Sequence, residues 1–258
     1  MAVPTYNARV IVVRKTKLKE SDLILTMLAE DGSQIRAVAK GARKPKSSFA
    51  SRLELFSVAD VLCAKGRSLD VVSEVRLVEG NARLRCDIEL AAAAAPAAEI
   101  IERSTQAGLA CPNLFAMTRT ALGAMCETSA AYAPSLAAAH LMKTFAMTGV
   151  RPMLASCAAC GNPVSASPDG SVAFSPREGG VICSHCRGHV ESSYVSAAAA
   201  EWADFLLRST FSDIARAQVG VREAFSVLDL CQRWSIEHVG CKLRSLLFLF
   251  TSGLYQEK

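Results

Sequence analysis

Several signatures of membrane, exported and catalytic proteins are missing from the 258-residue sequence. It has no apolar run approaching the roughly 18 residues that a transmembrane helix needs. The N-terminus does not show the charged and then apolar pattern of a signal peptide, because Arg9 interrupts it early. There is no Gly-Lys dipeptide for a phosphate-binding loop and no Gly-x-Ser-x-Gly motif for a serine nucleophile. We therefore expect a cytoplasmic protein without membrane contact and without these kinds of catalytic machinery.

Catalytic side chains are also scarce. The chain has four histidines, and its carboxylates form no organised cluster along the sequence. The segment His189-Val190-Glu191 is similar to the His-x-Glu element of zinc deaminases, which in those enzymes precedes a Pro-Cys-x-x-Cys element. Here it follows both Cys-x-x-Cys pairs, and Ser156 and Ile182 stand before those pairs in place of proline. We therefore assign no catalytic residue and expect a protein that is not an enzyme.

The first third of the chain has the composition of β-strands. Hydrophobic residues make up 51% of the whole sequence and charged residues 21%, which excludes a wholly disordered chain. Segments rich in valine, isoleucine and leucine alternate with turns such as Asp31-Gly32, and the predicted strands are Ala8–Arg14, Leu23–Ala29, Gln34–Lys40, Leu53–Leu62 and Leu69–Val75. Five short strands favour a closed barrel of the oligonucleotide-binding (OB) type, because closure removes the sheet edges. A different small barrel or a sandwich is also compatible with this pattern.

From about residue 81 the composition becomes rich in alanine and typical of helices. Apolar residues at three- and four-residue spacing predict helices at Asp87–Gln106, Leu114–Glu127, Ser135–Thr148, Ala197–Ser209, Val221–Trp234 and Ile236–Thr251. Pro96 should kink the first of these or divide it in two. The predicted fold class is therefore a multidomain α+β protein. We expect the barrel at 1–80, a helical domain from 81–150 and 195–258, and an inserted module at 151–194.

Two cysteine pairs give the most specific local signal. Cys157-Ala-Ala-Cys160 and Cys183-Ser-His-Cys186 are separated by 22 residues. Each pair can place two thiolates on one ion, and two pairs supply the tetrahedral four-sulfur shell that zinc prefers. Four protein ligands leave no open position for a substrate, so we expect one structural Zn²⁺ per chain. Two disulfides or two redox pairs are the alternatives.

The charge distribution indicates a second site. No acidic residue lies between Asp31 and Glu54, but that interval contains Arg36, Lys40, Arg43, Lys44, Lys46 and Arg52. Such a run is typical either of a solvated face or of a surface that binds polyanions. Its Gly, Pro and Ser residues predict a loop that can follow a phosphate backbone, where Phe49 either stacks on an unpaired base or packs under the barrel. The alternative DNA site is the earlier basic group of Arg14, Lys15, Lys17 and Lys19.

Three blocks of the sequence resemble RecO, the bacterial recombination-mediator family of DNA repair. The first block runs from Lys19 to Leu28 and continues at Val38–Ser47. The second combines Thr148–Leu154 with the two cysteine pairs, and the third is His238–Phe248. The helical stretch 81–145 matches the family in texture only. Together the blocks span nearly the whole chain in the family's order.

The resemblance implies an N-terminal OB barrel, a helical domain and a zinc-binding insertion. It also implies binding of single- and double-stranded DNA, annealing of complementary strands, and loading of RecA together with RecR, with RecF as a further possible partner. DNA contact carries over to the basic loop at Lys40, Arg43, Lys44, Lys46 and Arg52. No active-site residue carries over, and a bacterial, nucleoid-associated location is implied.

The family also contacts the acidic, aromatic-ended tail of single-strand DNA-binding protein (SSB). Such a tail needs an apolar pocket and nearby cations. In this chain the C-terminal segment offers Lys242, Arg244, Leu246, Leu247 and Phe250 at suitable spacing, although apolar stripes on helices usually belong to the core. The alternative function for the whole chain is a zinc-ribbon transcription factor or a nucleic-acid-processing enzyme built on the same barrel.

Overall fold

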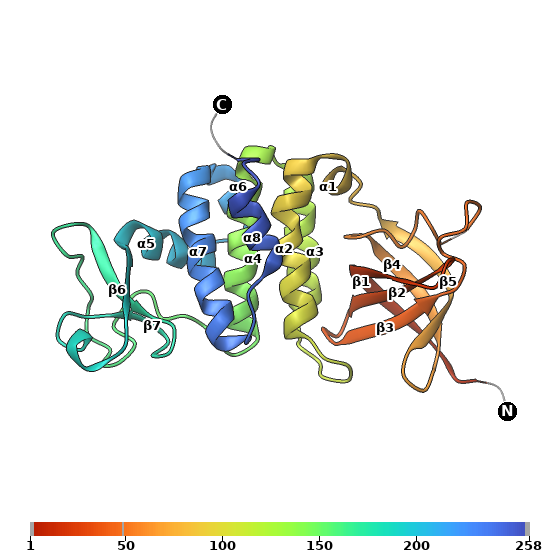
Figure 1. The fold of residues 1–258 in the computed structure, drawn as a ribbon, viewed down its shortest axis with the longest axis horizontal. Helices are drawn as coiled ribbons and strands as arrows, with labels where there is room; N and C mark the ends of the chain where they lie inside the picture. Colours follow the sequence, from red (N-terminus) through yellow and green to blue (C-terminus); the bar gives the residue numbers. More distant parts are fainter. Residues whose placement is uncertain (1–2, 48, 256–258) are drawn as a thin grey trace. The chain divides into compact units, whose positions relative to one another are not determined.

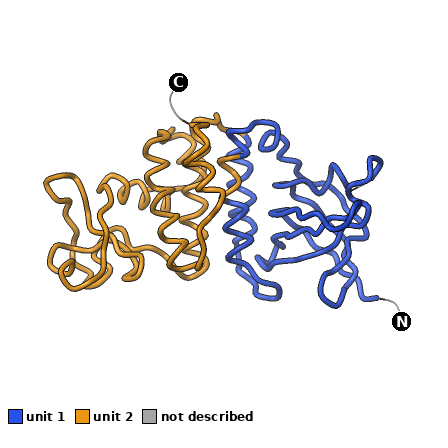
Figure 2. The backbone as a smooth tube through the Cα atoms, viewed as in Figure 1, with its two compact units in different colours: residues 1–91, 97–126 blue, residues 92–96, 127–258 orange. Residues whose placement is uncertain are grey.

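The computed structural model describes residues 3–47 and 49–255 and divides the chain into two compact units (Figure 2). Unit 1 comprises residues 1–91 and 97–126, and unit 2 comprises residues 92–96 and 127–258. No helix of the described residues is both long enough and apolar enough to cross a membrane.

Unit 1 contains a closed five-stranded barrel, which confirms the predicted fold class. Its strands are β1 (Thr5–Leu18), β2 (Asp22–Ala29), β3 (Gln34–Ala39), β4 (Val58–Ala64) and β5 (Asp70–Glu79), in the order β1-β2-β3-β5-β4 (Figure 1). The long strand β1 pairs with both β2 and β4, and a bulge between Val12 and Arg14 bends it. Small and branched residues such as Val10, Leu25 and Ala37 fill the interior.

The predicted strand at Leu53–Leu62 begins later than expected. The structure has a turn over Leu53–Ser57, and β4 starts at Val58. Phe56 has a φ of +69°, a left-handed conformation that interrupts a strand, and its carbonyl accepts a hydrogen bond of 2.9 Å from the Asn81 side chain. The ring of Phe56 is buried, so burial of this residue and not strand pairing explains the apolar pattern here.

Unit 1 also contains α1 (Arg83–Cys86), α3 (Leu114–Glu127) and most of α2 (Ile88–Ser104), whose residues 92–96 belong to unit 2. Asp87 caps α2 by accepting hydrogen bonds from the backbone N–H groups of Glu89 and Leu90. Pro96 lies inside α2 without dividing it, so of the two predicted effects, a kink or a division, the division does not occur. Proline has no backbone N–H, and this 17-residue helix tolerates the loss of that one hydrogen bond.

Unit 2 is built around α4 (Ala133–Met147), which follows the short 3₁₀ turn η1 (Ala130–Tyr132). Nearly every residue of α4 is buried, because α5 (Ala197–Arg208), α6 (Phe211–Ala217) and α7 (Val221–His238) all pack on it (Figure 1). Helix α6 was missing from the sequence prediction, although Thr210 and Asp213 form a capping box at its start.

The predicted helix Ile236–Thr251 is two helices in the structure. Helix α7 extends to His238, and α8 (Arg244–Thr251) begins after a break. The Gln232 side chain bridges this break, because it accepts from the Leu243 N–H at 3.0 Å and donates to the Leu243 carbonyl at 3.2 Å. Gly240, at a φ of +72°, allows the chain to turn between the helices.

Between α4 and α5 the chain forms a small sheet of β6 (Ser171–Ser175), β7 (Gly180–Ile182) and β8 (Ser193–Ser196), in the order β7-β6-β8, with a 3₁₀ turn η2 (Arg187–His189). Trp234 of α7 holds this module. Its ring lies 5.9 Å from that of Phe174 on β6, and its indole N–H donates to the Val150 carbonyl at 2.9 Å.

Candidate metal centre and nucleic-acid interface

The four paired cysteines converge in unit 2. All four Sγ atoms lie within 4.8 Å of one another, and those of Cys160 and Cys183 are 3.7 Å apart. The first knuckle is a tight turn in which the Gly161 N–H donates to the Cys157 carbonyl at 2.8 Å. The second begins directly after β7, and the Arg187 N–H donates to the Cys183 carbonyl at 3.1 Å. The sheet therefore fixes one pair opposite the other.

This geometry fits a tetrahedral metal site. Zinc–sulfur bonds of about 2.3 Å place ligand sulfurs roughly 3.8 Å apart, close to the Cys160–Cys183 separation, whereas a disulfide needs about 2.05 Å. All ten cysteines are free thiols, so the structure does not form the alternative disulfides. The four cysteines can therefore hold one metal ion and leave it no vacant position.

The electrostatics of the four thiols also favour a cation. Burial alone would raise the pKa of Cys157, but the backbone N–H groups of Cys183, Cys160 and Ala159 lower it to about 6. The hydrogen bond with Cys160 and then burial raise the pKa of Cys186 to about 12. Cys186 thus keeps its proton for a hydrogen bond to a neighbouring sulfur, and the charge of Cys157 adds to this effect. A divalent cation would take the place of such protons and allow all four sulfurs to ionise.

On the barrel, two of the predicted DNA-binding residues are Arg36, on the outer face of β3, and Lys40, directly after that strand. Arg36 and Lys40 are both exposed, and Val38 lies between them on the same face because side chains alternate along a strand. Val38 continues a row across four strands, formed by the exposed Thr16 and the half-exposed Ile24, Val38 and Val71. The face therefore combines a mostly apolar row with cations on either side of it.

The basic loop, defined here as residues 40–52, is fastened to the β1–β2 turn at Lys19–Ser21. The Gly41 N–H donates to the Asp22 carboxylate at 2.8 Å, and the Arg43 N–H donates to the Ser21 carbonyl at 2.9 Å. The Arg43 guanidinium donates to the carbonyl of Glu20 at 2.8 Å and also contacts that of Lys19. We call this set of hydrogen bonds the Asp22–Arg43 clamp.

The structure separates the predicted DNA-binding cations by role. The side chains of Lys40, Lys44 and Lys46, the loop lysines, are exposed and form no ion pair within the described residues. Arg43 is engaged with backbone carbonyls, and Arg52 lies 3.4 Å from the Val75 carbonyl. Phe49 packs against the barrel core, as its alternative interpretation predicted.

The earlier basic group also divides. Arg14 pairs with Glu102 at 2.6 Å and Lys15 with Glu54 at 2.7 Å. Lys17 and Lys19, the turn lysines, are exposed and have no ion pair in the described part of the chain. Sequence reasoning offered this group only as an alternative to the basic loop. The residue that links this group to the basic loop is Asp22, the acidic residue at the start of β2, which accepts a hydrogen bond from Gly41.

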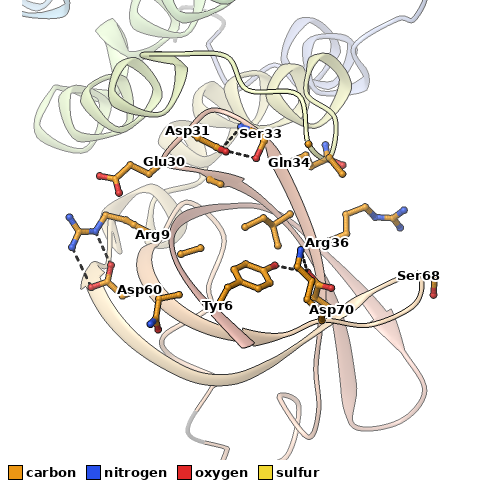
Figure 3. Close-up of a pocket in the computed structure, with 17 residues that line it drawn as sticks. Tyr6, Arg9, Glu30, Asp31, Ser33, Gln34, Arg36, Asp60, Ser68 and Asp70 are labelled. Atoms are coloured by element: carbon orange, nitrogen blue, oxygen red, sulfur yellow. Dashed lines mark hydrogen bonds and ion pairs between the residues drawn. The ribbon is translucent and has the colours of Figure 1, made fainter. Parts of the chain in front are cut away.

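One mouth of the barrel holds a cavity of about 1310 Å³ (Figure 3). Tyr6 points across the mouth and donates to the Asp70 carboxylate at 2.5 Å. Burial and then this hydrogen bond raise the pKa of Tyr6 well above its ordinary value. Carboxylates also line the rim, among them Asp60, which pairs with Arg9 at 2.8 Å. Of the predicted DNA-binding residues only Arg36 lines this cavity, together with Arg9, Lys65 and the carboxylates of Glu30, Asp31, Asp60 and Asp70.

The predicted partner residues occupy different faces of α8. Leu246 is fully buried, and Phe250 is half-buried with its ring 5.8 Å from that of Phe225. Lys242 and Arg244 are exposed, and Leu247 is 43% exposed. The exposed apolar surface here is therefore the predicted Leu247 together with Phe248, and the sequence interpretation did not single out Phe248.

Comparison with known proteins agrees with both halves of this structure. The sequence model described as "Recombination protein O N terminal" matches residues 1–81, and "Recombination protein O C terminal" matches residues 85–247. A DNA repair protein RecO of Desulfitobacterium hafniense is 36% identical over 182 residues, which cover 70% of this chain and 64% of that protein. One of Dehalococcoides mccartyi is 30% identical over 235 residues, covering 91% of this chain and 90% of the relative. One of Bifidobacterium longum is 36% identical over 181 residues, 69% of this chain and 72% of that protein. The matched regions include the barrel, the helices and the four-cysteine module, and the chain belongs to the recombination protein O (RecO) family.

Proposed function

We propose that this chain is a non-enzymatic recombination mediator of DNA repair, which binds single- and double-stranded DNA and anneals complementary strands. The observation that carries the proposal is the set of exposed lysines on an OB-type barrel that form no ion pair within the described residues, in a chain whose relatives are named DNA repair proteins. We further propose that it helps to load RecA onto SSB-coated single strands together with RecR.

The proposed contact with DNA is electrostatic and independent of sequence. Lysines on a loop can follow phosphates and displace condensed counterions, which gives affinity that falls with salt. The row of Ile24, Val38 and Val71 presents apolar surface, which can lie against the faces of bases without reading their hydrogen-bonding edges. Arg36 and Lys40 would hold the backbone on either side of that row.

Annealing on such a surface needs no bond chemistry from the protein. Two complementary strands repel each other through their phosphates, and a surface that neutralises part of that charge lowers the barrier to their meeting. This supports a mediator without catalytic residues or a nucleotide cofactor.

We propose that the metal of the four-cysteine site is zinc and that its role is structural. Cys157, Cys160, Cys183 and Cys186 would supply all four ligands, and the bound ion would neutralise their thiolates. The ion would then stabilise residues 151–194 as an insertion in a helical domain of residues 81–150 and 195–258, next to a barrel domain at 1–80.

The exposed end of α8 is the proposed contact for the acidic tail of SSB. Lys242 and Arg244 would meet the carboxylates of the tail and Leu247 its apolar end, while the buried Leu246 and the packed Phe250 would support the helix from below. RecR, and RecF through it, are the other proposed partners.

Strand annealing tests the main proposal. Two complementary oligonucleotides, one labelled with a donor and one with an acceptor fluorophore, are mixed with the protein in the absence of nucleotide. We expect the protein to accelerate annealing equally for oligonucleotide pairs of unrelated sequence, and we expect this acceleration to disappear at high salt. A preference for one duplex sequence, without annealing, would support a transcription factor instead.

A further inference from the structure

Asp22 is an acidic residue in the middle of a cationic surface. Its carboxylate accepts hydrogen bonds from the Gly41 N–H at 2.8 Å and from the Ser21 hydroxyl at 3.0 Å. Both hydrogen bonds lower the pKa of Asp22, and the one from Gly41 has the larger effect. The charges of Lys19 and Lys40 lower this pKa further. A negative charge at this place reduces attraction for DNA, so its contribution must be of another kind.

The geometry indicates that contribution. Lys19 is the first residue of the β1–β2 turn and has a φ of +56°, and Gly41 follows β3 with a φ of +65°, so both segments depart from extended structure where they meet. The Asp22–Arg43 clamp joins them with hydrogen bonds from two backbone N–H groups and one guanidinium. Without these bonds the first residues of the basic loop would lose their hydrogen bonds to the turn, and the burial of Ala42 in the barrel core would have to hold them in place.

The clamp also brings the two groups of lysines together. Lys17 stands opposite Leu23, which stands opposite Ala39, the residue before Lys40. Lys19 and Lys40 both act on the Asp22 carboxylate through their charge. The turn lysines and the loop lysines therefore lie at the same end of the barrel, although the sequence presented them as alternative sites.

We infer that the turn lysines and the loop lysines form one phosphate-binding surface, and that Asp22 and Arg43 are positioning residues that hold its two halves together. This inference rests on the proposed function, since it divides the DNA site of that function into contacting and positioning groups. Arg43 then serves the site through its hydrogen bonds to protein carbonyl oxygens, and the turn lysines contact the phosphates of the DNA directly.

The first test measures the turn lysines. Binding of a fluorescein-labelled oligothymidine is followed by anisotropy over a range of salt concentrations. For single strands each contact contributes about 0.7 to the slope of log K against log salt, or about fivefold in affinity near 0.1 M salt. The double substitution Lys17→Ala with Lys19→Ala should make this negative slope shallower by about 1.4 and should weaken the affinity by about 25-fold. An unchanged slope in this double variant would overturn the inference.

The second test separates the clamp from simple charge, and Glu20 is the matched control. Glu20 is the neighbouring acid, and its carboxylate takes no part in the clamp. If charge alone mattered, Glu20→Ala and Asp22→Ala would both strengthen DNA binding. We expect Glu20→Ala to strengthen it and Asp22→Ala to weaken it by about 25-fold, as if two contacts were lost. Asp22→Asn should restore binding, because it keeps the oxygen that accepts from Gly41.

Failure of the inference is distinguishable from failure of the proposed function. In a chain whose loop lysines are already alanine, Asp22→Ala should cause no further loss, because nothing remains to be positioned. If Asp22→Ala strengthens binding as Glu20→Ala does, the clamp has no role while the DNA site stands. If the wild-type protein shows no salt-dependent binding, the proposed function itself is wrong.

Discussion

Tyr6 and Asp70 close one mouth of the barrel: the phenol donates to the carboxylate at 2.5 Å, and the two residues are 64 positions apart in the chain (Figure 3). The Lys65 ammonium lies 4.5 Å from the centre of the Tyr6 ring and 3.9 Å from the Asp70 carboxylate. The Gly66 N–H donates to the same carboxylate at 3.0 Å. The loop between β4 and β5 is therefore fixed to the first strand through Asp70 and through the contact of Lys65 with the Tyr6 ring.

Tyr6→Phe should lower the free energy of unfolding by about 1.5 kcal/mol, because a hydrogen bond to a charged group is lost. Burial alone would raise the pKa of Asp70, but the Tyr6 hydroxyl, the Gly66 N–H and Lys65 together lower it below 3.8. The stabilisation is therefore fully present above pH 3.8 and is lost as the pH falls through the lowered pKa.

Urea unfolding at several pH values measures this difference. The gap between wild type and Tyr6→Phe should be constant near neutral pH and shrink in acid. Tyr132→Phe is the control, since its hydroxyl makes only a 3.5 Å contact with Gln218. A Tyr6→Phe variant as stable as the control would show that the bond contributes nothing.

Purified protein should contain one zinc ion per chain. Cys183→Ser should release it and loosen residues 151–194, because structural zinc sites contribute on the order of 10–16 kcal/mol of binding free energy in small domains. Trp234 reports on this module through its contact with Phe174. In a Trp202→Phe background its fluorescence should change on metal loss.

Elemental analysis gives the metal content, and Cys231→Ser is the control because Cys231 is buried in α7 outside the cluster. Zinc-free protein with intact disulfides between the pairs would contradict the metal assignment.

Replacing the three loop lysines together with alanine should weaken DNA binding uniformly across sequences. Three lost contacts should flatten the slope of log K against log salt by about 2 on single strands. Lys242→Ala, which changes an exposed lysine of unit 2, is the control for general charge. If the triple variant keeps the wild-type slope, the basic loop does not contact phosphates.

Arg244→Glu should weaken binding of a peptide with the acidic, aromatic-ended sequence of an SSB tail by about tenfold, because a cation is exchanged for a repelling carboxylate. Annealing of naked DNA should be nearly unchanged. Isothermal titration with the peptide measures the first effect. Equal affinity in wild type and variant would place the tail on another helix.

Much of the barrel could be predicted from the sequence because inward side chains such as Leu25 and Met27 alternate with outward ones. The start of β4 could not. It depends on Phe56, whose backbone is held by Asn81 from 25 residues away, and no local pattern records that contact. The break between α7 and α8 has the same origin, since the Gln232 side chain crosses it.

The two candidate sites differ in how far the sequence could define them. The cysteine cluster could be predicted because Cys-x-x-Cys spacing is itself the local geometry of the ligands. The roles of the cations could not, because they depend on pairing between distant segments. Arg43 looks like any other loop cation until the barrel brings it to the carbonyl of Glu20.

Within residues 3–47 and 49–255, only two residue pairs join β3 to β5, namely Ala37 with Asp70 and Val38 with Val71, and they are the parallel pairs of the barrel. The other neighbouring strands are joined over longer antiparallel stretches. Local opening favours the segment with the fewest backbone bonds, so amide hydrogens along this seam should exchange with solvent before those of β1 and β2. Val38 lies on the proposed DNA face, and a ligand that binds only the closed barrel must slow that opening. Occupancy of the face and closure of the barrel are thereby thermodynamically linked.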